Sequence, residues 1–386
     1  MRVVLHSSGM GGALRSLKLA SQLSRDLPDA SLLAITDLAF IGHLELPANL
    51  DYLHVPATGD PSVEEGLMPR LRSGRTALAL RSQIADGALE SFDPDLVIVD
   101  RDPLGLEAEL ARPLERQRRR RPRARFLAVL PDVAGVPERV RSQWRDAGVY
   151  GALEEIYDAT LVLGARDVFD AERAYALPAA VAQKLHYTGY LRHRVDPAAA
   201  RAKVEREGID ADRPFVLVSA GSGRGGFPLL DAYLGFLESR PAGPPFQSHL
   251  LCGPFLPPSA RRQLEARSEA LPDVFLHRFH RNLDPYFHRA DLLVSTFGYN
   301  TCCQILSFAA PAIVVPAGPA CEEEMLRAEV LAGRGLVELI APSELSSERL
   351  GGRVMQQLRQ PTPRGRELPS LDGLENFAKR ASEGLC

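Results

Sequence analysis

The chain has 386 residues, of which 45% are hydrophobic and 25% charged, and a formal net charge of −3. This length suits two domains of roughly 150 to 200 residues, and the small net charge argues against bulk nucleic-acid binding. Five cysteines form no CxxC pair and no histidine lies at metal-ligand spacing, so we expect reduced thiols and no metal site. A strand starts at residue 2 and no apolar run is long enough to span a membrane. We therefore expect a cytoplasmic protein without a signal peptide.

The first strand, Arg2–His6, is followed by a glycine-containing loop and an amphipathic helix over residues 14–23. Glycine lets a backbone approach a ligand closely. This makes Gly9, Gly11 and Gly12 candidates for a binding loop. The loop lacks the third glycine of a dinucleotide fingerprint. Strand, loop and helix in this order predict an α/β domain.

A later strand at residues 95–99 ends in the polar segment DRDPLG. Ligands of open parallel sheets bind beyond the carboxyl ends of strands. Asp102 and Glu107 are therefore candidate general bases. The alternative is that they serve turn formation and the charge preference of a helix start.

The second half of the chain begins with a strand at residues 214–218 and a glycine loop that fits GxGxxG. The dinucleotide interpretation requires an acidic residue about 20 residues further on, at the end of the next strand. That strand ends in Cys252-Gly253-Pro254, without an acid. We therefore predict a phosphate-facing loop, with Arg224 as a counter-ion. Its candidate binding residues are Gly221, Ser222, Gly223 and Arg224.

The chain is organised around residues 290–328, which read as strand, tight turn, helix, strand, loop and helix. The turn Gly298-Tyr299-Asn300-Thr301 opens the first of these helices. The N–H groups and positive dipole end of a helix start favour an anion. The alternative is an ordinary capped helix in a βαβ unit.

The Gly298 turn leads to Gln304, Pro311, Pro316 and Arg327-Ala328. This pattern resembles the donor motif of inverting glycosyltransferases of family 28, which includes the lipid-linked N-acetylglucosaminyltransferase of peptidoglycan synthesis. It resembles a branch of predicted bacterial glycosyltransferases still more closely. The resemblance spans nearly the whole chain and is strongest from about residue 219 to 336.

The resemblance implies the GT-B fold, in which two Rossmann-like, doubly wound domains flank a ligand cleft and a final helix returns to the first domain. We accordingly expect an N-terminal acceptor-binding domain at residues 1–195 and a nucleotide-sugar-binding domain at residues 196–370. Residues 371–386 would form the returning helix.

By this resemblance the donor would lie at the Gly298 turn and the Gly221 loop. Phe279 would pack on the nucleobase, although a core phenylalanine is the alternative. The ribose-binding position, usually glutamate, is Gln304, and a neutral hydrogen bond is worth about 1 kcal/mol against about 1.5–3 kcal/mol for a charged one. The acid–glutamine pair that contacts the sugar is Glu323-Glu324. An ionised Glu324 cannot donate to a sugar hydroxyl, which suggests an amino- or deoxy-sugar, unless both are simply an acidic helix start.

The family usually carries a histidine where this chain has Gly12, and a general base contributes roughly 10²–10⁴ in rate. His6 matches another histidine that is common in the closer branch. His6, Asp102 and Glu107 are therefore the three candidates for the base. A structural role at the end of a buried strand is the alternative for His6.

Together these features predict an inverting, metal-independent glycosyltransferase without a cofactor. It would use a UDP- or dTDP-sugar and a small-molecule, natural-product or lipid-linked envelope acceptor.

The arginine run at residues 116–125 is either a solvated helix end or a membrane-facing patch. Departures at Gly12, Gln304 and Glu324 motivate one alternative, a non-catalytic sugar-nucleotide-binding auxiliary protein. A nucleotide-sugar epimerase is the other. The sequence leaves open the nucleobase, sugar and acceptor, and whether the protein is a monomer or homodimer.

Overall fold

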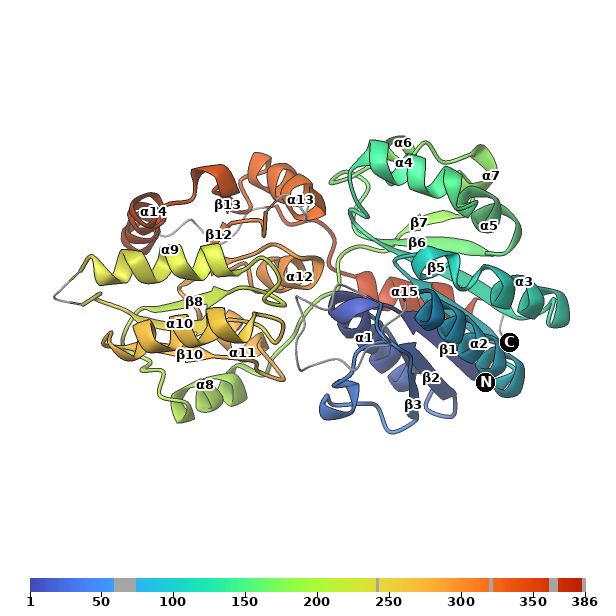
Figure 1. Cartoon of the computed structure of the whole chain (residues 1–386), viewed down its shortest axis with the longest axis horizontal. Helices are drawn as coiled ribbons and strands as arrows, with labels where there is room; N and C mark the ends of the chain where they lie inside the picture. The colour runs from blue at the N-terminus through green and yellow to red at the C-terminus, as the bar shows by residue number, and fades with distance from the viewer. Residues whose placement is uncertain (59–73, 241–242, 319–321, 361–366, 384–386) are drawn as a thin grey trace. The chain divides into compact units, whose positions relative to one another are not determined.

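A computed structural model describes residues 1–58, 74–240, 243–318, 322–360 and 367–383 (Figure 1). The chain divides into two compact units, which we describe separately. The first unit runs to Leu191 and takes up the chain again from Pro369, and the second is Arg192–Leu368. The boundaries expected near residues 195 and 370 lie a few residues after these positions. The spacing of apolar residues also predicts a helix over residues 64–92; it is present from Gly74 to Phe92, and its part before residue 74 lies outside the described residues.

The first unit is built on a seven-stranded parallel sheet with the order β3-β2-β1-β4-β5-β6-β7. Its strands are β1 (Arg2–Ser7), β2 (Ser31–Thr36), β3 (Leu50–His54), β4 (Leu96–Asp100), β5 (Arg125–Pro131), β6 (Ala159–Leu163) and β7 (Leu185–Tyr187). Its helices are α1 (Gly9–Asp26), η1 (Ile41–His43), α2 (Gly74–Phe92), η3 (Leu106–Ala108), α3 (Ala111–Arg120), α4 (Pro137–Asp146), α5 (Val149–Glu155), α6 (Ala171–Ala174), α7 (Ala179–Ala182) and α15 (Gly373–Ser382). The central strands β4 and β6 are buried along their whole length, as expected when helices cover both faces of a parallel sheet.

The predicted glycine loop after the first strand is wrong in extent. β1 continues to Ser7 and α1 begins at Gly9, so that Gly9, Gly11 and Gly12 lie in the first turn of a helix. The chain turns at Ser8, which is extended, and Gly9 then adopts a φ of +71°. Its N–H donates to Asp37 Oδ1 at 2.7 Å, which closes the turn within so few residues.

The second unit is built on a six-stranded parallel sheet with the order β10-β9-β8-β11-β12-β13. Its strands are β8 (Phe215–Ser219), β9 (Gln247–Leu251), β10 (Val274–His277), β11 (Leu292–Ser295), β12 (Ala312–Val314) and β13 (Glu338–Leu339). Its helices are α8 (Pro197–Arg206), α9 (Phe227–Glu238), α10 (Pro258–Glu269), α11 (Asp284–Arg289), α12 (Tyr299–Phe308), α13 (Glu322–Gly333), η4 (Pro342–Glu344) and α14 (Ser347–Arg359). Every residue of β8, β9 and β11 is buried, so helices cover both faces of this sheet too.

The expected return of the last helix to the first unit is confirmed. Helix α15 packs against α1, and the side chain of Phe377 is fully buried. Asn376 Nδ2 donates to Thr188 O at 2.8 Å, which ties the helix to the segment after β7. Leu374, on the same helix, is half-buried.

Candidate active site

Each sheet has one point at which the strand order reverses beside its first strand. In the first unit β1 lies between β2 and β4, and in the second β8 lies between β9 and β11. Ligands of doubly wound sheets bind outside the carboxyl ends of the strands at such switch points. Ser219 and Ser295, the last residues of β8 and β11, pair in register, and Thr296 N donates to Ser219 O at 3.0 Å. The Gly221 loop and the Gly298 turn therefore start side by side.

The glycines of the Gly221 loop are required by close contact between loops. Gly223 has a φ of +93°, and a Cβ there would lie 2.6 Å from both Cys252 O and Leu256 N. A Cβ on Gly225 would overlap the carbonyl oxygen of Ala317. The loop after β8 thus packs directly on the loops after β9 and β12. Close packing between loops therefore explains why glycines occur in the GxGxxG pattern, and no dinucleotide-binding role is needed to explain them.

The two side chains predicted to bind phosphate in this loop differ in exposure. Ser222 is half-buried, and its carbonyl oxygen accepts a hydrogen bond from Phe255 N at 2.9 Å. Arg224 is exposed, and its guanidinium carbon lies 5.1 Å from the centre of the Phe255 ring. Stacking on a buried ring therefore holds a cation at the carboxyl edge of the sheet.

The predicted helix start at the Gly298 turn is confirmed. Gly298 is the extended residue that precedes α12, and Tyr299, Asn300 and Thr301 form the first turn. Cys302 N donates to Gly298 O at 3.0 Å, which closes that turn. The first turn of α12 contains no acidic residue, so the helix itself supplies no charge to offset its dipole.

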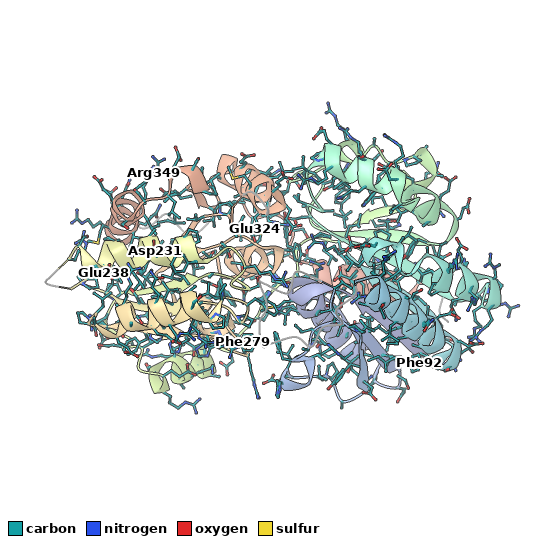
Figure 2. The ribbon with its side chains drawn as sticks, viewed as in Figure 1. Phe92, Asp231, Glu238, Phe279, Glu324 and Arg349 are labelled. Carbon is teal, nitrogen blue, oxygen red and sulfur yellow. The ribbon has the colours of Figure 1, made fainter. Side chains whose placement is uncertain are left out.

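A carboxylate from α13, that of Glu324 (labelled in Figure 2), lies against this turn. Glu324 Oε2 accepts hydrogen bonds from Phe297 N at 3.1 Å and from Ala317 N at 3.0 Å. Burial raises the pKa of Glu324, against the opposing effect of these two N–H donors and of Arg327. Arg327 is itself buried, and its Nη1 donates to Phe297 O at 3.0 Å. One carboxylate thus links the loops that follow β11 and β12.

Gln304 is held by Asp284, which is itself in contact with His193, and sequence reasoning selected neither residue. Its Nε2 donates to Asp284 Oδ1 at 2.8 Å, and His193 Nδ1 lies 2.7 Å from the same oxygen. His193 N in turn donates to Ser307 Oγ at 2.9 Å, on the same helix as Gln304. A glutamate at position 304 would set two carboxylates against each other. The amide therefore suits this environment, although the sequence around Asp284 signals only a helix start.

The remaining donor candidates also lie at the carboxyl edge. Phe279 follows β10 and is half-buried, so it is not a core side chain (Figure 2). Strand β9 separates it from the Gly221 loop in the sheet order. Glu323 is half-buried in the first turn of α13, next to Glu324. The structure thus places the donor candidates at the carboxyl edge of one sheet, with Phe279 after a strand two places from β8 in the sheet order.

Three histidines that the sequence analysis did not select lie close to Phe279. His277 Nε2 is 3.1 Å from His249 Nδ1, and the rings of His277 and His280 are centred 4.8 Å apart. Burial lowers the pKa of all three, and that of His249 falls to about 3. In the register of β9 and β10, His249 pairs with Phe275 and His277 with Leu251, so the two histidines are diagonal neighbours. This proximity is recognisable only once the register is known.

In the first unit, His6 lies at the end of β1 and is buried, with 4% of its surface exposed. Its Nε2 is 3.4 Å from Glu109 Oε1, and its Nδ1 has no hydrogen-bond partner among the described residues. Arg81 Nη2 donates to Glu109 Oε1 at 2.7 Å, and Arg81 Nη1 lies 3.2 Å from Asp37 Oδ2. Although burial opposes it, hydrogen bonds from His6 and Arg81 lower the pKa of Glu109.

The two carboxylates predicted as bases are placed differently. Asp102 is half-buried in the turn after β4, where its carbonyl oxygen accepts from Gly105 N at 2.7 Å. Glu107 is exposed, with a left-handed φ of 48° within η3. The acid that contacts His6 is Glu109, two residues further on. Only the fold distinguishes it from Glu107, because both follow the same strand.

Gly12, where the family usually has a histidine, faces Asp100 at the end of β4. A Cβ on Gly12 would lie 3.8 Å from Asp100 Oδ2, an ordinary contact distance. Asp100 accepts hydrogen bonds from Arg15 Nε at 2.9 Å, Arg15 Nη2 at 2.8 Å and Ser16 Oγ at 3.1 Å, all buried. A buried ion pair thus lies beneath the position of the missing side chain.

The arginine run predicted as a solvated helix end or membrane patch pairs with carboxylates. Arg116 pairs with Asp86, Arg118 with Asp158, and Arg121 with Asp93 and Asp95. Within the described ranges, no helix combines the length and apolar character needed to cross a membrane. Those ranges also contain no group of three or more histidine, cysteine, aspartate or glutamate side chains arranged to hold a metal ion.

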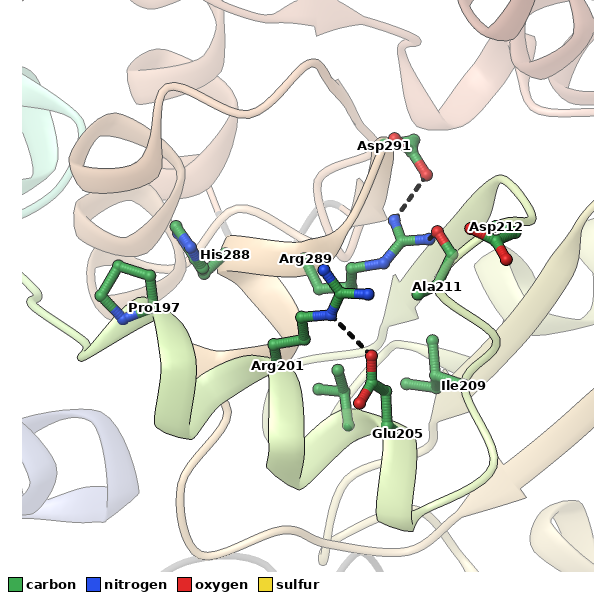
Figure 3. A pocket seen from close by; sticks show the side chains of 10 residues that line it. Pro197, Arg201, Glu205, Ile209, Ala211, Asp212, His288, Arg289 and Asp291 are labelled. Atoms are coloured by element: carbon green, nitrogen blue, oxygen red, sulfur yellow. Dashed lines mark hydrogen bonds and ion pairs between the residues drawn. The ribbon is translucent and has the colours of Figure 1, made fainter.

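A pocket of about 470 Å³ lies at the other end of the second sheet (Figure 3). Its lining includes Ala211 and Asp212, which precede β8, and Asp291, which precedes β11. Arg289 in its wall donates to Asp291 and to the carbonyl oxygens of residues 210, 211 and 213. Its charges serve the fold, and it contains none of the predicted site residues.

Residues 236–379 match the sequence profile of the glycosyltransferase family 28 C-terminal domain. No curated protein sequence matches the chain. The fold is similar to the glycosyltransferase of kitacinnamycin, with a TM-score of 0.63 and 15% identity over 100% of this chain and 96% of that one. It is also similar to UDP-GlcNAc 2-epimerase from Neisseria meningitidis, with a TM-score of 0.65 and 15% identity over 100% and 99%. The fold is also similar to MurG from Acinetobacter baumannii, with a TM-score of 0.55 and 15% identity over 98% of this chain and 94% of that one.

The profile covers α12, α13 and the Gly298 turn, which carried the resemblance in the sequence. Residues 236–379 thus match a glycosyltransferase family 28 C-terminal domain, and the two sheets have the arrangement of the GT-B fold. The expected family resemblance, fold class and enzyme class, glycosyltransferase, are confirmed.

Proposed function

We propose that this glycosyltransferase transfers a sugar, with inversion and without a metal, from a UDP- or dTDP-sugar held by its second unit. The observation that carries the proposal is the position of the Gly298 turn. It opens α12 at the switch point of the sheet, within the segment that matches the family 28 domain. The start of α12 and the Gly221 loop would hold the diphosphate, and helix dipole and arginine charge would stabilise it as a leaving group.

The other donor contacts follow from the same arrangement. Gln304 would accept from the ribose, because its amide nitrogen is directed to Asp284 and its oxygen remains as the acceptor. Phe279 would pack on the nucleobase, and Glu323 and Glu324 would contact the sugar. The first unit would bind the acceptor at the start of α1, near Gly9, Gly11 and Gly12.

The base remains one of His6, Asp102 and Glu107, and the His6–Glu109 pair supports His6. An ionised Glu109 stabilises the imidazolium that forms when His6 takes a proton. The acceptor would be a small molecule, a natural product, as the name of the kitacinnamycin enzyme suggests, or a lipid-linked envelope precursor. We propose a cytoplasmic monomer or homodimer without a nucleic-acid partner.

Calorimetric titration with UDP, dTDP, GDP and NAD, in the presence of EDTA, tests the donor site. We expect micromolar binding of UDP or dTDP. We also expect weaker binding by a Gly221→Val variant, because a side chain there would collide with Thr296 Oγ1 at 2.8 Å. Binding of NAD alone would refute the transferase. If none of the four ligands binds, the result would favour the non-catalytic auxiliary protein.

A nucleotide-sugar epimerase is a second candidate, because the Neisseria epimerase shares the fold over the full length of this chain. The match to the family 28 domain favours transfer. Incubation with UDP-N-acetylglucosamine and no acceptor separates the two functions. Appearance of the 2-epimer in the NMR spectrum would support the epimerase, and we expect none.

A further inference from the structure

The side chain of Glu324 accepts hydrogen bonds from two backbone N–H groups at the switch point of the second unit. Its Oε2 accepts from Phe297 N and Ala317 N, and its Oε1 lies 3.6 Å from where a Cβ on Gly298 would stand. The carboxyl group therefore lies over the residue that precedes α12. An anion bound at this helix start would meet a second negative charge at close range.

The charged groups around Glu324 do not cancel that repulsion. Of its described neighbours, Arg327 on its own helix is the cation, and it is engaged by Phe297 O and lies 5.9 Å from the Tyr299 ring centre. Glu323 on the same helix adds a negative charge. Phe297, Gly298 and Ala317, from the loops packed against the carboxyl group, carry no ionisable side chain. Although the α12 dipole and Arg224 would attract a diphosphate, it would also face the negative charges of Glu323 and Glu324 while Glu324 is ionised.

We propose that the donor binds to the form of the protein in which Glu324 carries a proton, so that donor binding takes up one proton from solvent. The proposal rests on the proposed donor site and adds its regulation by pH. A protonated carboxyl group keeps a carbonyl oxygen, which can still accept from Phe297 N and Ala317 N. It also gains an O–H donor for a phosphate or sugar oxygen. In this form Glu324 offers the same donor and acceptor pair as a glutamine.

The electrostatics support the proposal independently of the ligand. Burial raises the pKa of Glu324 above that of an ordinary glutamate. Protonating its carboxylate therefore requires less free energy at a given pH than protonating a glutamate on the surface. A nearby diphosphate would raise that pKa further. Affinity should therefore fall as the pH rises through the pKa of free Glu324, by up to about tenfold per pH unit.

The test compares the full-length protein with Glu324→Gln and with Glu329→Gln. The second variant removes the same charge from an exposed position of the same helix. The probes are UDP-glucose and dTDP-glucose, whose diphosphate does not titrate between pH 5.5 and 8. Titration in buffers of different ionisation enthalpy counts the protons taken up on binding, and it needs no variant.

We expect the unsubstituted protein and Glu329→Gln to bind about tenfold or more weakly at pH 8 than at pH 5.5. Glu324→Gln should bind at pH 8 about tenfold or more tightly than the unsubstituted protein, without that pH dependence or proton uptake. Equal affinities of all three proteins at every pH, or no proton uptake, would overturn this inference and leave the donor site standing. No binding of either probe by any protein would overturn both.

Discussion

At the switch point of the first unit, buried charged side chains hold one another, whereas at that of the second unit glycines bring backbone loops into contact. Arg81 joins Glu109 and Asp37 in the first unit. Gly223 fits between the loops of the second unit because it has no side chain. The first arrangement depends on electrostatics in a place that excludes water, and the second on steric fit. The two units should therefore fail under different substitutions.

The largest expected effect is in the first unit. Arg81→Met would leave the buried carboxylates of Glu109 and Asp37 without their guanidinium, and should lower the free energy of unfolding by about 3–5 kcal/mol. Fluorescence of Trp144, the single tryptophan, reports the first unit during denaturation by urea. Arg116→Met, which removes an exposed ion pair with Asp86, should cost less than about 1 kcal/mol. Equal losses would contradict the assignment of a buried charge network.

The second unit should respond to acid through its histidines. Burial lowers the pKa of His249 from 6.5 to about 3, so the unfolded chain binds a proton in this interval that the folded chain does not. Stability should therefore fall as the pH drops from about 6.5 toward 3, by on the order of 3 kcal/mol. His249→Gln should flatten this part of the pH profile of thermal unfolding, measured by circular dichroism.

The exposed His288 serves as the control for this pH effect, since His288→Gln should leave the profile unchanged. Trp144 fluorescence, which reports the other unit, should not follow the histidine effect. The same pH profile for His249→Gln and the unsubstituted protein would show that the cluster does not couple to folding.

A glycine substitution should break the steric fit of the second unit. Gly223→Ala places a Cβ against two backbone atoms at a φ of +93°, and should cost about 1–3 kcal/mol. Gly352→Ala, at an open position within α14, should instead be neutral or stabilise by up to about 1 kcal/mol. Thermal unfolding of both variants, compared with that of the unsubstituted protein, measures the two changes in stability. A harmless Gly223→Ala would mean that the loops can separate at little cost.

The smallest expected effect on stability comes from a substitution that replaces the neutral amide of Gln304 with a charged group. Gln304→Glu would set a carboxylate beside Asp284 Oδ1 and should lower stability at neutral pH by about 1 kcal/mol. In an Asp284→Asn background the same change should cost little, because the repulsion is gone. This double-mutant cycle, measured by urea denaturation, isolates the pair. Additive losses would show that residues 284 and 304 do not interact.

Sequence reasoning was most successful where the signal is local. The helix start at Gly298 follows from an apolar strand, a turn and helical spacing within about ten residues. The returning helix came from the family resemblance, since no local pattern near Phe377 names its partner. Gly9, Gly11 and Gly12, predicted in a loop, lie in the first turn of a helix, and the N–H of Gly9 donates to Asp37, which is distant in sequence.

The sequence by itself determined the α/β alternation, the two-unit size and the residue types at both switch points, because hydrophobic period and turn chemistry act over a few residues. Only the tertiary structure decided which acid meets His6, what holds Gln304, and where Glu324 binds. His193 and Asp284 are 91 positions apart, and Arg81 and Glu109 are 28 apart. Such pairs form when strand order brings different loops to one edge of a sheet, and no pattern along the chain encodes that order.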